Sequence, residues 1–236
     1  MAPFTIAIIA ITALVSFGGF NSAALMEKFL FEPARIVRHG EYYRLITSGF
    51  LHANWAHLFF NMFSLYSFGG VIESRFGMPA FLAIYFSSIL GGNLLSLFLH
   101  RSHEYRALGA SGGVCGIIFA SIFLMPGSGV YVFPVPMPIP AHIFAILFIL
   151  ISFFGVRGRR GNIGHDAHLG GAIIGLAVTT ILHPEIVSDN FMLWIIVMSL
   201  ALVLFMYLYK KPPYPVGGSR TSIDEHEEAG RWPWHR

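Results

Sequence analysis

The chain has 236 residues, of which 55% are hydrophobic and only 11% are charged, whereas about a quarter of a soluble globular chain is charged. This composition excludes an ordinary cytosolic protein and indicates an integral, multi-pass membrane protein, which we expect in the cell membrane. The net charge of +3 is small and its basic residues lie between apolar segments, so we expect no nucleic-acid partner. The single cysteine, Cys115, excludes an internal disulfide and a cysteine-based zinc cluster.

Seven apolar segments are candidates for crossing a bilayer core, which takes roughly 20 helical residues. They lie at 4–25, 53–72, 79–99, 108–125, 140–156, 167–182 and 191–209. None shows the period-2 alternation of an outer-membrane barrel. We therefore predict an all-α polytopic helical bundle, with one membrane domain at residues 1–209 and a polar tail at residues 210–236 that we expect to be disordered.

Two connections between these segments have a distinctive composition. Segment 26–52 mixes apolar residues such as Phe31 and Ile36 with charged ones, which is typical of an amphipathic element in the membrane interface. Segment 126–140 contains five prolines, so we expect an irregular connection outside the membrane core.

Polar side chains inside membrane spans are costly and by default mark function. His57 and Asn61 lie four residues apart in the second span, and so share a helix face. Ser111 lies near the start of the fourth span and His168 near the start of the sixth. Because the second, fourth and sixth spans run in the same direction, we predict that these groups meet just below one membrane surface.

Glycine pairs suggest how the fourth and sixth spans could touch. Gly112 and Gly116 form a GxxxG pattern on the fourth span, and Gly171 and Gly175 form another on the sixth. Such pairs let helix backbones approach closely. We expect the two helices to cross here, with Ser111 and His168 beside the crossing.

This combination favours nucleophilic catalysis. A serine hydroxyl becomes a good nucleophile when a neighbouring imidazole accepts its proton, which would make Ser111 the nucleophile and His168 the general base. The attack creates an oxyanion, which His57, Asn61 and the backbone N–H of Ser111 could stabilise. Taken alone, each residue has a structural explanation, such as a bond from Ser111 to its own helix, a packing histidine, or an interhelical amide at Asn61. Their joint occurrence on three parallel helices favours the catalytic interpretation.

Four neighbouring residues have other interpretations. Asp166 lies two residues before His168 and so faces another direction, which disfavours a Ser-His-Asp triad; we predict that it caps the start of the sixth span. His165 could form a second polar wall, and Cys115 is expected to be a packing residue. For His52, an interfacial and a catalytic role both remain open.

At these residues the chain resembles the rhomboid family of intramembrane serine proteases. The matching motifs, which lie within residues 43–182, are Gly109-Ala110-Ser111-Gly112, the pair His57 and Asn61, and Ala167-His168-Leu169-Gly170-Gly171 with Gly175. The resemblance implies a Ser111–His168 dyad, oxyanion donors at His57 and Asn61, and no metal or organic cofactor. It also implies that the protein lies in a lipid bilayer and hydrolyses peptide bonds in or near transmembrane helices of membrane-protein substrates.

Two features depart from the usual family pattern. The first loop has Tyr43-Arg44 where the family often has Trp-Arg, and tyrosine is also suited to the interface. A seventh span follows the six-span core. Inactive relatives lack the serine or the histidine, and both are present here.

Two non-enzymatic alternatives stay open. The first is a membrane carrier or metal- or haem-binding protein that uses His57, His165 and His168 as ligands. The second is a scaffold that binds transmembrane helices through its glycines.

The basic residues also predict an orientation. If the seven segments all span, 14 of the 15 Lys and Arg residues lie on the side of Ser111, and only Arg75 lies opposite. The positive-inside rule then places the candidate site and the tail in the cytoplasm. The family resemblance implies the opposite side.

Overall fold

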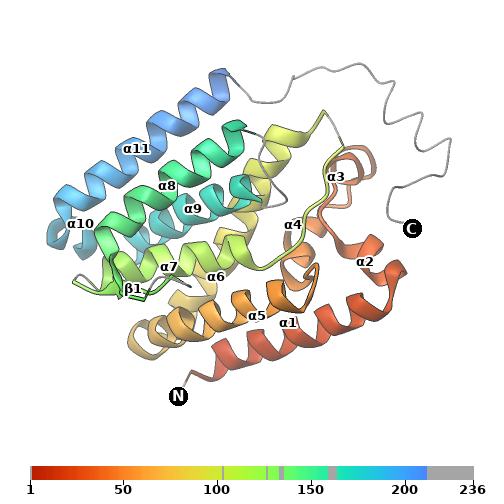
Figure 1. Cartoon of the computed structure of the whole chain (residues 1–236), viewed down its shortest axis with the longest axis horizontal. Helices are drawn as coiled ribbons and strands as arrows, with labels where there is room; N and C mark the ends of the chain where they lie inside the picture. The colour runs from red at the N-terminus through yellow and green to blue at the C-terminus, as the bar shows by residue number, and fades with distance from the viewer. Residues whose placement is uncertain (1, 103, 126, 133–135, 159–163, 212–236) are drawn as a thin grey trace.

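The computed structural model describes residues 2–102, 104–125, 127–132, 136–158 and 164–211. The architecture is helical, as the sequence predicts (Figure 1). The α-helices are α1 (Pro3–Asn21), α2 (Ala23–Phe29), α3 (Pro33–His39), α4 (Arg44–Thr47), α5 (Trp55–Ser64), α6 (Gly70–His100), α7 (Ser111–Leu124), α8 (Ala141–Gly158), α9 (His165–Leu182), α10 (Glu185–Asp189) and α11 (Phe191–Lys210). A 3-10 turn, η1 (Ser48–Phe50), precedes α5, and a π-helical turn, η2 (Leu65–Gly69), joins α5 to α6.

Five continuous helical segments are long and apolar enough to cross a membrane, namely Pro3–Asn21, Trp55–His100, Ala141–Gly158, His165–Leu182 and Phe191–Lys210. The chain is therefore an integral, multi-pass membrane protein, and α7 is a shorter apolar helix. Segment Trp55–His100 has 46 residues, about 69 Å if straight, which is more than twice a bilayer core. It breaks at Gly77, whose φ is +84°, between the two spans predicted there. The number of membrane crossings stays a prediction.

The helix α9 lies inside the bundle, where it packs against α6, α7 and α8 (Figure 1). The predicted crossing of α7 and α9 is present. A side chain at Gly171 would overlap the carbonyl of Gly112, and one at Gly175 would overlap the backbone of Gly116. A second close contact, which the sequence analysis missed, joins α9 to α6, where a Cβ at Gly170 would lie 2.9 Å from the Gly91 carbonyl oxygen.

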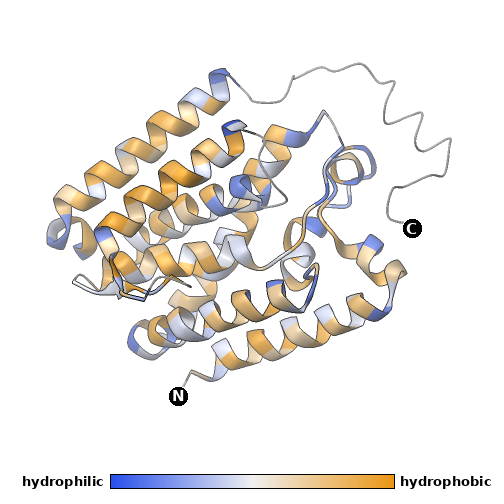
Figure 2. Ribbon diagram, viewed as in Figure 1, coloured by the Kyte–Doolittle hydropathy of each residue, from blue (hydrophilic) through white to orange (hydrophobic). Residues whose placement is uncertain are grey.

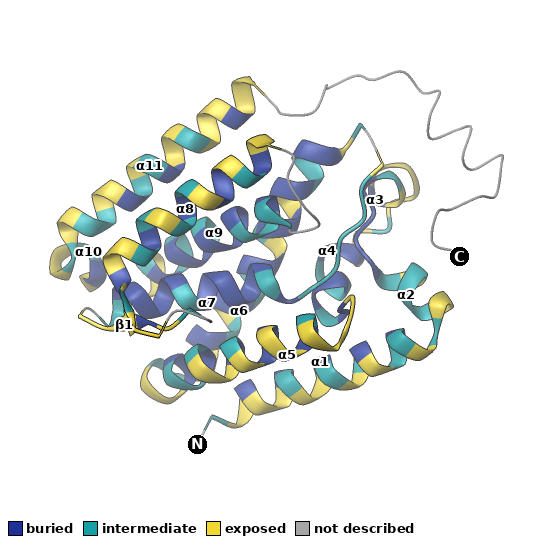
Figure 3. Ribbon diagram, in the orientation of Figure 1, coloured by how far each residue is buried: buried dark blue, intermediate teal, exposed yellow. Residues whose placement is uncertain are grey.

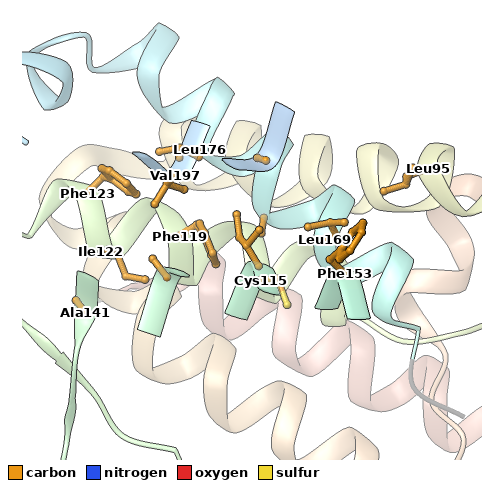
Figure 4. Packing of buried hydrophobic residues seen from close by; sticks show 14 of the residues in the cluster. Leu95, Cys115, Phe119, Ile122, Phe123, Ala141, Phe153, Leu169, Leu176 and Val197 are labelled. Atoms are coloured by element: carbon orange, nitrogen blue, oxygen red, sulfur yellow. The ribbon is translucent and has the colours of Figure 1, made fainter. Parts of the chain in front are cut away.

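Apolar side chains of α7, α8, α9 and α11 fill the space around these crossings (Figure 4). Phe119 and Phe123 on α7 pack in the same cluster as Leu169 on α9 and Phe153 on α8. Cys115 is buried in this cluster as a free thiol, as the packing interpretation predicts. Figure 3 shows the buried residues concentrated on α6, α7 and α9, whereas α1, α5 and α11 carry many exposed ones.

The segment 26–52 folds into short helices beside one end of the long ones (Figure 1). Figure 2 shows its mixture of polar and apolar residues. Arg44 is buried, and its guanidinium donates to the carbonyl oxygens of Glu27 (2.8 Å) and Leu30 (2.7 Å). It also pairs with Glu41 at 2.6 Å, and this hydrogen bond lowers the pKa of the Glu41 carboxyl.

In the described part of 126–140, β1 (Gly129–Val130) pairs antiparallel with β2 (Ile139–Pro140), so the predicted irregular connection contains a minimal hairpin. The expected disorder of the tail falls almost wholly on residues 212–236, outside the described part of the chain.

Candidate active site

Ser111 is the first residue of α7, and Ala110 is its N-cap. Its backbone N–H therefore belongs to the first helical turn, whose N–H groups have no partner within the helix. Gly109, just before the cap, has φ +133° and donates its N–H to Ser48 O at 3.0 Å. A Cβ at Gly109 would lie 2.8 Å from His57 Cε1 and 3.8 Å from Ser111 Oγ. The GxSG turn thus brings Ser111 beside the His57 ring, and only glycine fits its first position.

His57 is held at the start of α5 by its own helix. Its N–H donates to the N-cap side chain of Asn54 at 2.9 Å. Its Nδ1 accepts the N–H of Ala53 at 3.5 Å, which in a neutral ring leaves the proton on Nε2. A Cβ at Gly109 would lie 3.0 Å from that Nε2, so the N–H donor of His57 lies on the side of the GxSG turn.

Asn61 lies one turn further along α5 and is buried. Its Nδ2 donates to His57 O at 2.9 Å. One of the two amide N–H groups therefore bonds its own helix and not a neighbouring one, and the other is free of that bond.

His168 lies in the first turn of α9 and is partly exposed. The preceding carbonyl, Ala167 O, lies 3.3 Å from the position of a Cβ on Gly112, so the first turns of α7 and α9 are in close contact. Among the hydrogen bonds between described residues, none joins the Ser111 hydroxyl to the His168 ring. Catalytic hydrogen bonds are often long without substrate and shorten when it binds.

His52 is fully buried and lies directly behind this site. Its Nε2 accepts the N–H of Ala110 at 3.4 Å, and its Nδ1 lies 2.9 Å from Ser16 Oγ. Because the Ser16 hydroxyl donates to Phe50 O at 2.9 Å, the Nδ1 of His52 carries the ring proton. Burial, with a smaller effect of His57, lowers the pKa of His52 to about 3, which agrees with a neutral ring. Ser16, on α1, carried no sequence signal, because a lone serine in an apolar span is common.

Asp166 is not the cap of α9, and that prediction is wrong. The N-cap is Gly164, which makes no side-chain cap, and Asp166 is the second residue of the helix. Its carboxylate instead pairs with His100 Nε2 at 3.0 Å and accepts the Tyr105 hydroxyl at 3.2 Å. The capping prediction considered only residues close to Asp166 in sequence, whereas its partners in the fold lie more than 60 residues away.

His165 lies near His168 on its own helix and packs against α8. Its ring lies 6.3 Å from the His168 ring, and a side chain at Gly155 of α8 would overlap it. Within the described residues, no group of three or more His, Cys, Asp and Glu side chains is arranged to hold a metal ion.

The fold and these residues together define a polytopic helical membrane protein with a serine and histidines at the starts of packed helices. Residues 39–185 match the family model described as Rhomboid domain. The chain belongs to the rhomboid family.

Several curated proteins are similar over the same region. The chain is 32% identical over 174 residues to RHOMBOID-like protein 12, mitochondrial, of Arabidopsis thaliana, which covers 66% of this chain and 50% of that one. It is 30% identical over 178 residues to Rhomboid protease GluP of Bacillus subtilis, covering 73% and 33%. It is 30% identical over 190 residues to Rhomboid protease AarA of Providencia stuartii, covering 72% and 67%. The chain spans about half or less of the length of most of the relatives it matches.

Proposed function

We propose that this chain is an intramembrane serine endopeptidase that hydrolyses peptide bonds in or near transmembrane helices of membrane-protein substrates. The observation that carries the proposal is the GxSG turn, which places Ser111 at the start of α7 beside His57 and against the first turn of α9. Membership of the rhomboid family and the protease names of two relatives support the same activity.

In the proposed reaction Ser111 Oγ attacks the scissile carbonyl while His168 accepts the hydroxyl proton. The negative charge then develops on the carbonyl oxygen, where the His57 ring N–H, the Asn61 amide and the Ser111 backbone N–H act as donors. His168 returns the proton to the leaving amine as the peptide bond breaks, which leaves an acyl-enzyme at Ser111. Water, deprotonated by His168, attacks this ester and releases the second product with the serine restored.

A serine-reactive fluorophosphonate tests the nucleophile without a known substrate. The purified protein should form a covalent adduct, and Ser111→Ala should lose it. Ser121→Ala is the matched control, because Ser121 lies on the same helix, is buried and, among the described residues, donates its hydroxyl to its own helix at Ile117 O. Equal labelling of the wild-type chain and Ser111→Ala, or no labelling of either, would contradict the proposal.

A further inference from the structure

A buried contact between a carboxylate and a histidine joins the end of α6 to the start of α9. His100 Nε2 lies 3.0 Å from Asp166 Oδ2, and the two side chains are only 3% and 6% exposed. Tyr105, in the connection between α6 and α7, donates its hydroxyl to the other carboxylate oxygen at 3.2 Å. Its ring stacks on that of His100, with centroids 3.6 Å apart and planes at 9°. One carboxylate therefore binds groups from two other parts of the chain.

The helix dipole at the start of α9 favours a carboxylate there, because Asp166 lies in the first turn of that helix. His100 lies in the last turn of α6. A buried carboxylate is costly unless it is paired and hydrogen-bonded. The contacts to His100 and Tyr105 therefore hold the first turn of α9 in place, because a movement of that turn would break them.

Tyr105 also belongs to the connection between α6 and α7, which ends at Ser111. Tyr105 also packs edge-on against Phe31 at 6.1 Å. Two residues later, Ala107 exchanges backbone hydrogen bonds of 2.9 and 3.1 Å with Phe31. Gly109 then bonds Ser48 O, directly before the α7 cap. Through Tyr105, Asp166 is therefore linked to the connection between α6 and α7, whose backbone hydrogen bonds to Phe31 and Ser48 precede Ser111. Asp166 also lies two residues from His168.

We propose that Asp166 is a positioning residue, which through His100 and Tyr105 fixes the first turn of α9 so that His168 meets Ser111. This inference rests on the proposed Ser111–His168 dyad. The glycine contacts fix how closely α9 approaches α6 and α7, whereas the carboxylate fixes the turn that carries the base. Asp166 does not contact the reacting atoms, because it lies about 200° around the helix from His168.

The test compares Asp166→Asn and Tyr105→Phe with the wild-type chain in liposomes that contain a cleavable model transmembrane substrate. Asp166→Asn should lower kcat on the order of 10-fold or more with KM within about twofold, because a small displacement of a base slows the chemical step rather than binding. Tyr105→Phe keeps the ring and loses the hydroxyl that bonds Asp166, so its kcat should fall less, by about threefold. Asp166→Glu, which keeps the charge, should recover part of the loss.

The matched control is Glu73→Gln, because Glu73 is also a buried carboxylate that joins two helices. It accepts the N–H of Phe4 and both the N–H and the hydroxyl of Thr5. This substitution should lower the thermal midpoint without lowering kcat. If Asp166→Asn and Tyr105→Phe likewise lost only thermal stability, or raised KM at unchanged kcat, Asp166 would have no positioning role.

Fluorophosphonate labelling separates this proposal from the proposed function. Asp166→Asn should react more slowly than the wild-type chain but reach the same final extent, because Ser111 is still present. A wild-type chain without a Ser111-dependent adduct would overturn the dyad and this inference with it. A normal labelling rate in Asp166→Asn, with the wild-type adduct present, would overturn the positioning role alone. Should Asp166→Asn fail to fold, the kcat of Tyr105→Phe decides the question.

Discussion

Gly109 shows how strongly the backbone before Ser111 is constrained. Its φ of +133° is unfavourable for any residue with a side chain, and a Cβ would lie 2.8 Å from the His57 ring. The turn is held from one side by Ser48 O and from the other by His52, which accepts the N–H of Ala110. The position of Ser111, the proposed nucleophile, is therefore set by fixed backbone contacts, which favours a preorganised site.

Asn61→Ala should slow cleavage without abolishing it. Loss of one of several oxyanion donors costs on the order of 10²-fold in rate, with little change in KM. Asn21→Ala is a suitable control, because Asn21 Nδ2 makes the same kind of bond, to Phe17 O four residues earlier on α1. An Asn61→Ala variant that cleaves as fast as the wild-type chain would remove Asn61 from the site.

At the scale of helices, the crossing of α7 and α9 was predictable from the sequence and the contact with α6 was not. Gly112 with Gly116, and Gly171 with Gly175, repeat at the spacing of one helix face, so the pattern itself indicates a contact. Gly91 and Gly92 are adjacent and lack that spacing. The contact between Asp166 and His100 was likewise not predictable, because it depends on the fold that brings the end of α6 beside α9.

Gly171→Val or Gly112→Val should impair activity through helix packing. At Gly171 even a Cβ would overlap the Gly112 carbonyl, so Gly171→Ala should already separate the helices that carry Ser111 and His168. Overpacking of this kind costs about 1–3 kcal/mol of stability, and we expect cleavage to fall before the folded yield does.

Gly18→Ala is the control for this effect, because a Cβ there would meet only Leu25 Cδ1 at an ordinary 3.5 Å. Cleavage assays and thermal midpoints of the variants make the comparison. Full activity in both the Gly171 and the Gly112 variants would mean that this contact does not position the site.

For the whole molecule, the distribution of basic residues predicts which side of the membrane the candidate site faces. The polar ends of α6, α8 and α11 and the 26–52 segment lie toward one side of the bundle in Figure 2. Arg75 lies in the first part of α6, before its break at Gly77. The positive-inside rule predicts that the candidate site faces the cytoplasm, which is the opposite of what the family resemblance implies.

Cysteine labelling in intact bacterial cells tests this orientation. In a Cys115→Ala background, Ser219→Cys should resist a membrane-impermeant thiol reagent, and Ser74→Cys, beside Arg75, should react with it. Lysed cells provide the control for accessibility. The reverse labelling pattern in sealed cells would place the site outside and restore the usual family arrangement.

The central claim is that Ser111 and His168 together cleave peptide bonds of transmembrane substrates. The most direct measurement is the cleavage rate of a model transmembrane substrate by the purified protein in liposomes, for the wild-type chain, Ser111→Ala and His168→Ala. We expect each variant to fold, with an unchanged circular dichroism spectrum, and to lose activity by at least about 10³-fold. Ordinary cleavage by folded Ser111→Ala would contradict the account.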